Sequence, residues 1–350
     1  MFHRVLVTRP SAIRLLATSV SGTEQTLYSI KQQVDEYVYA RSLPKKWKPI
    51  VYRQKNADLL TSLDVADSEG RPILPKKYPG IPSKRRFVHF INQLILPEEL
   101  EAVKKTLSKV DRHAPDFLAP SMINALLYKS AEFGLFGEDL TFVYNLQNYR
   151  SQKIFGPRNI EAIILLRTLQ AKQSGVTDLD WAYRKLHHIF KHNKATEKET
   201  ALIKASQLCL FTQLLLNRAA ENTTVSPKDE QILNNKIKKA LESFSEKFVP
   251  YEVNAEKEIL EPSNSFDKWQ HAYAILKLLQ SNVSSLPEKS QSQFQKMTTD
   301  ISPFLEHVEE LGKAANKVTL LEILISKAKF STEVSEGAKE AEEAKEAEAQ

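Results

Sequence analysis

Three histidines, His187, His188 and His192, are the closest approach to a metal site in the sequence. His188 and His192 stand four residues apart, so a helix would place both on one face, where two imidazoles can bind one metal ion. No carboxylate lies between them, no third ligand is evident, and Lys185 and Lys191 add positive charge nearby. We therefore expect a polar helix edge here, exposed or facing RNA, and no bound metal.

Motifs for catalysis are missing from the sequence. There is no GxxxxGK or GxGxxG phosphate loop and no GxSxG nucleophile turn. Cys209, the only cysteine, lies in the apolar stretch ASQLCLFTQLLL, which indicates a small core residue. The neighbouring acids of Glu98–Glu99 and of Glu309–Glu310 point in different directions on a helix. We expect no enzyme, no catalytic residue, no cofactor and no small-molecule substrate.

Two basic blocks near the N-terminus suggest nucleic-acid binding. Neither block contains an acid, and the four acids of this region lie between them. Cations spaced along a backbone can follow successive phosphates, and aromatic rings among them can stack on unpaired bases. A solvated linker, or an arm docked on an acidic protein, is the alternative. The candidate RNA-binding residues are Arg41, Lys45, Lys46, Trp47, Lys48, Tyr52, Arg53 and Lys55 in the first block, and Arg71, Lys76, Lys77, Tyr78, Lys84, Arg85 and Arg86 in the second.

Prolines predict that residues 17–96 form an extended arm. Eight of the sixteen prolines lie at or before Pro97, and the stretch RPILPKKYPGIPSKRR alone contains four. Proline removes an amide donor and biases the preceding residue toward extended geometry. We expect an irregular arm with one short helix around residues 24–40 and no core of its own, which becomes ordered on RNA.

Charge is distributed unevenly along the 350 residues, whose formal net charge is +6. Residues 1–96 hold 16 basic and 7 acidic side chains, a net charge of +9. Residues 333–350 hold seven acids and two lysines, a net charge of −5, which leaves the region between them close to neutral. We take the low-complexity segment 331–350 as a solvated acidic tail.

The first sixteen residues predict a mitochondrial transit peptide. The start MFHRVLVTRPSAIRLLATSV carries three arginines with serine and threonine, and no acid precedes Glu24; this composition is typical of import into the matrix. Arg9 and Arg14 interrupt the apolar run that a secretory signal needs. A disordered basic terminus is the alternative. No apolar run approaches the roughly 20 residues of a membrane-spanning helix, so we expect no membrane span.

Apolar spacing predicts an all-α body over residues 97–330. The paired segments 120–152, 157–192 and 197–248 are expected to form helical hairpins, and PSMINALLYKSAEFG resembles the first helix of a pentatricopeptide hairpin. The predicted fold is an irregular bundle or short α-solenoid of such hairpins, preceded by the extended basic arm. Thr177 is the expected N-cap of the helix TDLDWAYRKLHHIFKH, and later helices are expected at 265–280, 288–299 and 303–329.

The stretch ARSLPKKWKPIVYR, the second basic block and the near-neutral helical body together resemble the lineage-specific small-subunit proteins of fungal mitochondrial ribosomes. This resemblance implies a structural ribosomal protein that binds mitochondrial rRNA through the arm and other mitochondrial ribosomal proteins through the body. Two alternatives stay open: a helical-repeat factor that binds mitochondrial transcripts for stability or translation, and a protein-only assembly factor for respiratory complexes.

Overall fold

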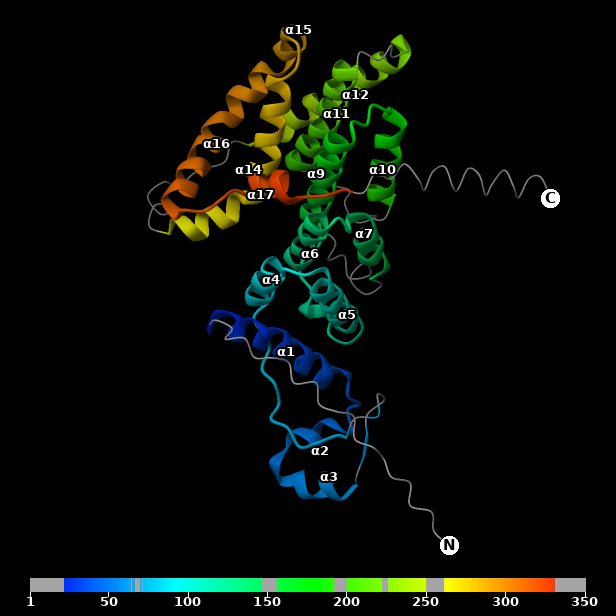
Figure 1. Ribbon diagram of the computed structural model, residues 1–350, viewed down its shortest axis with the longest axis vertical. Helices are drawn as coiled ribbons and strands as arrows, with labels where there is room; N and C mark the ends of the chain where they lie inside the picture. The colour runs from blue at the N-terminus through cyan, green and yellow to red at the C-terminus, as the bar shows by residue number, and fades with distance from the viewer. Residues whose placement is uncertain are drawn as a thin grey trace, which may run out of the picture. The chain divides into compact units, whose positions relative to one another are not determined.

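The computed structural model describes residues 22–63, 65–66, 70, 72–146, 156–191, 200–221, 226–249 and 261–330. The predicted transit peptide and acidic tail lie outside these ranges. In the described residues, helices dominate and strand pairing is limited to a single bridge between Ala66 and Pro72, which confirms the all-α prediction. None of the described helices is both long and apolar enough to cross a membrane. The chain forms two compact units, residues 1–90 and 91–350 (Figure 1).

The N-terminal unit opens with the long helix α1 (Gly22–Ser42). A helix around residues 24–40 is therefore confirmed, although it is longer than expected. Apolar residues three and four apart place one face of an amphipathic helix toward the interior. The buried members of this face are Ile30, Val34, Tyr37 and Val38.

Short helical segments follow: α2 (Lys48–Tyr52), η1 (Gln54–Asn56) and α3 (Ala57–Leu63). They surround a small hydrophobic core of Leu43, Val51, Leu60 and Ile73. The prediction that this region has no core of its own is therefore wrong. Pro49 lies in the first turn of α2, where a missing amide costs nothing, so this proline begins a helix instead of breaking one.

Residues 72–83 run extended, as their prolines predict. The chain reverses near Gly70, whose positive φ of 73° suits glycine. The Ile73 amide then donates to the Val65 carbonyl at 2.9 Å, and the Lys76 amide donates to the Val51 carbonyl at 3.0 Å. The second hydrogen bond attaches the proline-rich segment to the end of α2, and the first attaches it to the residues that follow α3.

The amphipathic helix α4 (Lys84–Asn92) follows the extended segment. Its basic first turn is exposed, whereas Phe87, Phe90 and Ile91 are buried. The rings of Phe87 and Phe90 stack with centroids 6.0 Å apart.

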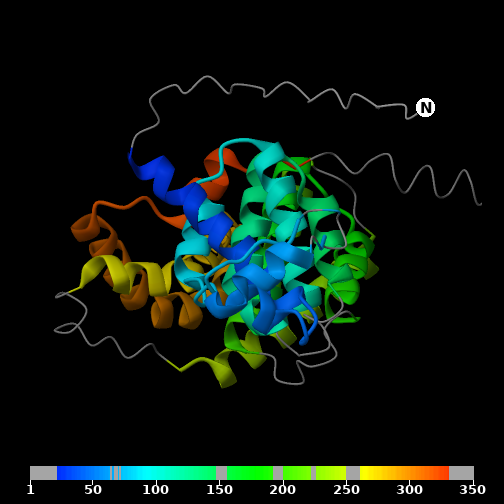
Figure 2. The ribbon, with the colours of Figure 1, turned by 90° about the horizontal axis from the view of Figure 1, so that it is seen from below.

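Hairpins build the second unit. The packing of α6 on α7, α9 on α10 and α11 on α12 agrees with the predicted pairs, and α6, α9, α11 and α14 pack in succession, as in a short solenoid. Helices α14 and α16 lie side by side in both views (Figure 1 and Figure 2). The helices described in this unit are α5 (Pro97–His113), η2 (Pro115–Phe117), α6 (Pro120–Phe133), α7 (Phe136–Asn145), α9 (Pro157–Ser174), α10 (Leu179–Lys191), α11 (Ala201–Glu221), α12 (Pro227–Lys247), α14 (Pro262–Ser284), α15 (Glu288–Gln291), η3 (Ser292–Phe294), α16 (Gln295–Ala315) and α17 (Leu320–Lys327).

The core of this unit is formed by α9 and α11, which are buried on all sides along residues 159–171 and 205–214. Burial on every face is typical of a central helix. Cys209 lies in this region and its thiol donates to the Ile275 carbonyl at 3.2 Å, so the predicted core role is confirmed. Because burial raises the pKa of the thiol, the reactive thiolate is disfavoured.

Some predicted helix boundaries are wrong. Asp178, not Thr177, caps α10: its carboxylate accepts hydrogen bonds from the amides of Asp180 at 2.8 Å and Trp181 at 3.1 Å. No helix begins at Pro303, which lies inside α16. Proline cannot make the backbone hydrogen bond of this position, but Ile301, Phe304 and Leu305 are buried on both sides of it. Their burial stabilises a helix that continues past Pro303. The second helix of the predicted hairpin 120–152 is α7, which starts at Phe136 and ends at Asn145.

Candidate nucleic-acid interface

The two basic blocks meet on the small core of the N-terminal unit. The Lys76 amide donates a hydrogen bond to the Val51 carbonyl. The Lys76 ammonium also lies 5.4 Å from the centre of the Tyr39 ring, a cation–π contact. Tyr52 and Tyr78 meet edge to face with ring centroids 5.1 Å apart. The structure thus brings residues 41–55 and 76–78 together, although the acid-bearing segment separates them in sequence.

Most of the predicted cations in this unit are open to solvent. Among the described residues, no acid forms an ion pair with Lys45, Lys46, Arg53 or Lys55. Such charges stay hydrated in the free protein and can release counterions when they meet phosphates. The exposed cations are Arg41, Lys45, Lys46, Arg53, Lys55, Lys76, Lys77, Lys84, Arg85 and Arg86; the predicted Arg71 lies outside the described residues.

Lys48 is more enclosed than its neighbours. Its side chain is half-buried, and Nζ donates to the Arg41 carbonyl at 3.3 Å. This carbonyl lies in the last turn of α1, where helix carbonyls lack partners within the helix. Lys48 therefore helps to join α2 to α1. Asn56 of η1 donates to the Pro49 carbonyl at 2.8 Å, which joins η1 to α2.

The predicted stacking residues differ in exposure. Trp47 and Tyr52 are partly buried and pack on the small core, whereas Tyr78 is exposed, with 50% of its surface open to solvent. Burial, together with the electrostatic influence of Tyr39, Tyr78 and Glu36, raises the pKa of Tyr52 to about 12. The geometry thus gives Trp47 and Tyr52 packing contacts within the domain and leaves Tyr78 the most open ring of the three.

Lys84, Arg85 and Arg86 form the first turn of α4, which contains no acid. A helix N-terminus carries partial positive charge, which repels the three cations of this turn. The cations and the helix end together attract anions more strongly than either alone. The Arg86 amide donates to the Ser83 hydroxyl oxygen at 3.3 Å, which supplies a cap. The local sequence therefore places concentrated positive charge where a phosphate would be stabilised.

The histidine cluster lies on α10. His187 and His188 are exposed, and the His188 ring meets Tyr144 with centroids 5.0 Å apart. His192 lies outside the described residues. No group of three metal-binding side chains occurs in the part of the chain that the structure describes.

A partly buried polar network in the second unit was not predicted from the sequence. His271 lies between Tyr128 and Glu161: its Nδ1 is 2.8 Å from the Tyr128 hydroxyl, and its Nε2 is 3.2 Å from Glu161 Oε2. Thr200 donates to the other Glu161 oxygen at 2.8 Å. Burial raises the pKa of Tyr128, so its phenol remains protonated. These groups tie α6, α9 and α14 to the start of α11, and their wide spacing in sequence leaves no local motif.

These observations define an all-α protein with a separate, folded and strongly basic N-terminal domain. Residues 8–93 match the family model of the MRP13-like N-terminal domain, and the N-terminal quarter of the chain is similar to that domain. Over these residues, the match confirms the resemblance to a mitochondrial ribosomal protein of the fungal small subunit. No curated protein matches the sequence.

Proposed function

We propose that the protein is a structural component of the mitochondrial small ribosomal subunit and acts in the matrix. The main support is the overlap between the MRP13-like match, residues 8–93, and the unit that carries both acid-free basic blocks. A ribosomal protein of this kind has no reaction to catalyse and needs no cofactor.

The N-terminal domain is the proposed rRNA-binding part. Its exposed lysines and arginines surround a core that is already packed, so binding requires less ordering of the backbone than a disordered arm would. Phosphate contacts from Lys45, Lys46 and Arg53 would position the domain on rRNA and make its affinity depend on salt.

The helical body is the proposed binding surface for neighbouring ribosomal proteins. Large apolar side chains are exposed on it, including Val318 at 61% and Ile325 at 49%. Exposed apolar groups of this size suit contacts between proteins more than contacts with a phosphate backbone.

Successive packing of α6, α9, α11 and α14 also favours a second candidate, a helical-repeat factor that binds mitochondrial transcripts. Sedimentation of a tagged chain through gradients at moderate and high salt separates the two. A structural component migrates with the small subunit and remains there after the salt wash. Release into light, nuclease-sensitive fractions would favour the transcript factor, and light, nuclease-insensitive complexes would favour a protein-only assembly factor.

A further inference from the structure

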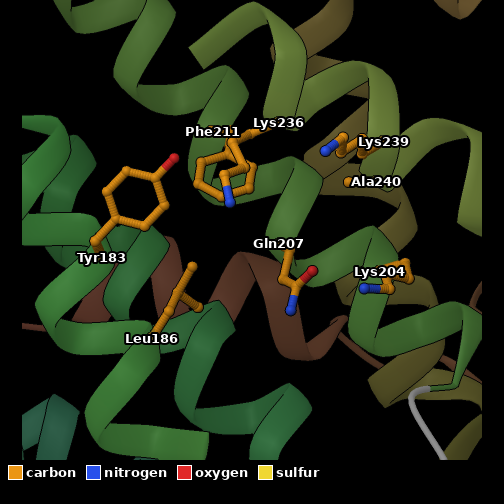
Figure 3. A pocket seen from close by; sticks show the side chains of 8 residues that line it. All are labelled: Tyr183, Leu186, Lys204, Gln207, Phe211, Lys236, Lys239 and Ala240. Atoms are coloured by element: carbon orange, nitrogen blue, oxygen red, sulfur yellow. The ribbon is translucent and has the colours of Figure 1, made fainter. Parts of the chain in front are cut away.

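A basic pocket of about 280 Å³ lies among α10, α11 and α12 in the second unit. Figure 3 shows Tyr183 and Leu186 on one side, Lys204 and Lys239 on the other, and Gln207 between them. The pocket is lined by Tyr183, Leu186, Lys204, Gln207, Phe211, Lys236, Lys239 and Ala240. The body as a whole is close to neutral, so this concentration of positive charge is local.

None of the lining residues is an acid, whereas three of them are lysines. In the described part of the chain, Lys236 and Lys239 form no ion pair. The Lys236 ammonium lies 5.3 Å from the centre of the Tyr183 ring, a cation–π contact that holds it over the pocket. Like charges that line one pocket repel one another, and a bound anion would relieve that repulsion.

The wall of the pocket also carries a donor without an acceptor. The Tyr183 hydroxyl is enclosed and makes no hydrogen bond with the described residues. Burial, with a smaller contribution from Asp180, raises the pKa of this phenol, so the group keeps its proton. An enclosed hydroxyl without a partner is costly, and an anionic oxygen would supply the acceptor.

We propose that this pocket binds a phosphate of single-stranded RNA, held by Lys204, Lys236 and Lys239 with the Tyr183 hydroxyl as a further donor. Lysine is a common phosphate ligand because its ammonium acts as a point charge. The rings of Tyr183 and Phe211, whose centroids lie 6.5 Å apart, add apolar faces beside the cations. Cations beside aromatic rings are typical of sites for single strands, whereas an acidic peptide would use only the charges.

The proposal is tested on the full chain with a twelve-nucleotide oligouridylate containing 4-thiouridine. We expect ultraviolet crosslinking to label a peptide that contains Tyr183 or Phe211. Lys236→Gln with Lys239→Gln should remove that crosslink and lower the salt slope of binding by about 0.7 units, the value for one phosphate contact on a single strand. Tyr183→Phe, which removes only the hydroxyl, should weaken crosslinking at the pocket.

The matched control is Lys228→Gln with Lys238→Gln, which removes the same charge from exposed positions of α12 outside the pocket. Equal loss in the control and pocket variants, with melting temperatures unchanged, would overturn the proposal, because only net charge would then matter. Displacement by oligoglutamate with no RNA crosslink at the pocket would identify an acidic protein as the occupant and would also overturn it.

The inference concerns RNA binding but does not depend on the N-terminal domain. Lys45→Gln with Lys46→Gln tests the proposed function separately. If these changes reduce binding while the pocket variant binds like the unaltered chain, the pocket proposal fails and the proposed function stands. If the pocket crosslink persists while these changes have no effect, the proposed role of the N-terminal domain fails and the pocket stands.

Discussion

The rings of Tyr52 and Tyr78 meet edge to face, with centroids 5.1 Å apart and planes inclined at 79°. Tyr52 ends α2 and Tyr78 lies in the extended proline-rich segment, so this contact joins the two basic blocks. The hydrogen bond from the Lys76 amide to the Val51 carbonyl attaches the same segment to α2, two residues before Tyr78. The proposed RNA surface is therefore a feature of the folded domain before any RNA is bound.

Hydrogen exchange should detect this preformed contact. The Lys76 amide donates to the Val51 carbonyl at 3.0 Å, so we expect its exchange to be slowed in the RNA-free protein. Lys77 is exposed, and no backbone acceptor is described for its amide, which makes it the internal control. Similar, fast exchange at both positions in the free protein would show that the segment becomes ordered only on RNA.

An alkaline titration should report the packing of Tyr52. Its pKa of about 12 means that the folded domain keeps the phenol neutral while the unfolded chain ionises it near its ordinary value of about 10. The corresponding stabilisation is complete below pH 10 and is lost as the pH rises from 10 toward 12. Phenolate absorbance measures this pKa, and Tyr78→Ala should lower it. A titration of Tyr52 near 10 in the unaltered protein would contradict the packing.

Local signals in the sequence were enough to predict much of the helical body. Gly134 and Gly175 end their helices with φ values of 78° and 63°, which glycine adopts without strain. Pro97, Pro120 and Pro157 each begin a helix, as their position in the first turn predicts. Such signals act over a few residues, so one sequence is sufficient to find them.

Features that depend on distant contacts were not predictable in this way. The small core joins Leu43, Val51, Leu60 and Ile73, which have no regular spacing in the sequence. The prolines around them therefore predicted an extended arm without a core. The basic pocket likewise needs the fold to bring α10, α11 and α12 together. The candidate cations were identified from composition, but only the structure separates the exposed side chains from Lys48.

The buried contact between Lys104 and Asp139 should be important for stability. Lys104 Nζ lies 2.5 Å from the Asp139 carboxylate, which is fully buried, and Ser130 donates to the same carboxylate at 2.6 Å. Burial lowers the pKa of Lys104, but hydrogen bonds to Asp139 and Glu101 outweigh it and the net shift is upward. Lys104→Met should lower the free energy of unfolding by about 3–5 kcal/mol, because a buried carboxylate loses its cation.

Lys317 provides the control for that measurement. It pairs with Asp267 at 2.7 Å, but both side chains are partly exposed, at 33% and 45%. Lys317→Met should therefore cost at most about 1 kcal/mol in denaturant unfolding. Equal costs for the two substitutions would show that the Lys104 contact is not a buried ion pair in solution.

Gly312 allows α16 to approach α14 closely. A Cβ at this position would lie 2.8 Å from a ring carbon of Phe266, which is fully buried. Gly312→Ala should therefore destabilise the body by about 1–2 kcal/mol, since overpacking exceeds the helix propensity that alanine adds. Gly80→Ala has open space around the new methyl group and should leave thermal stability almost unchanged. A stabilised Gly312→Ala protein would contradict the close packing.

The salt dependence of rRNA binding by the full chain is the most direct test of the basic domain. We compare the unaltered protein with Lys45→Gln, Lys46→Gln and Arg53→Gln combined, because these exposed cations have no acidic partner among the described residues. We expect weaker binding across RNA sequences and a salt slope lower by about two to three units, with an unchanged melting temperature. Equal affinity and an equal slope would show that the domain does not bind RNA through this surface.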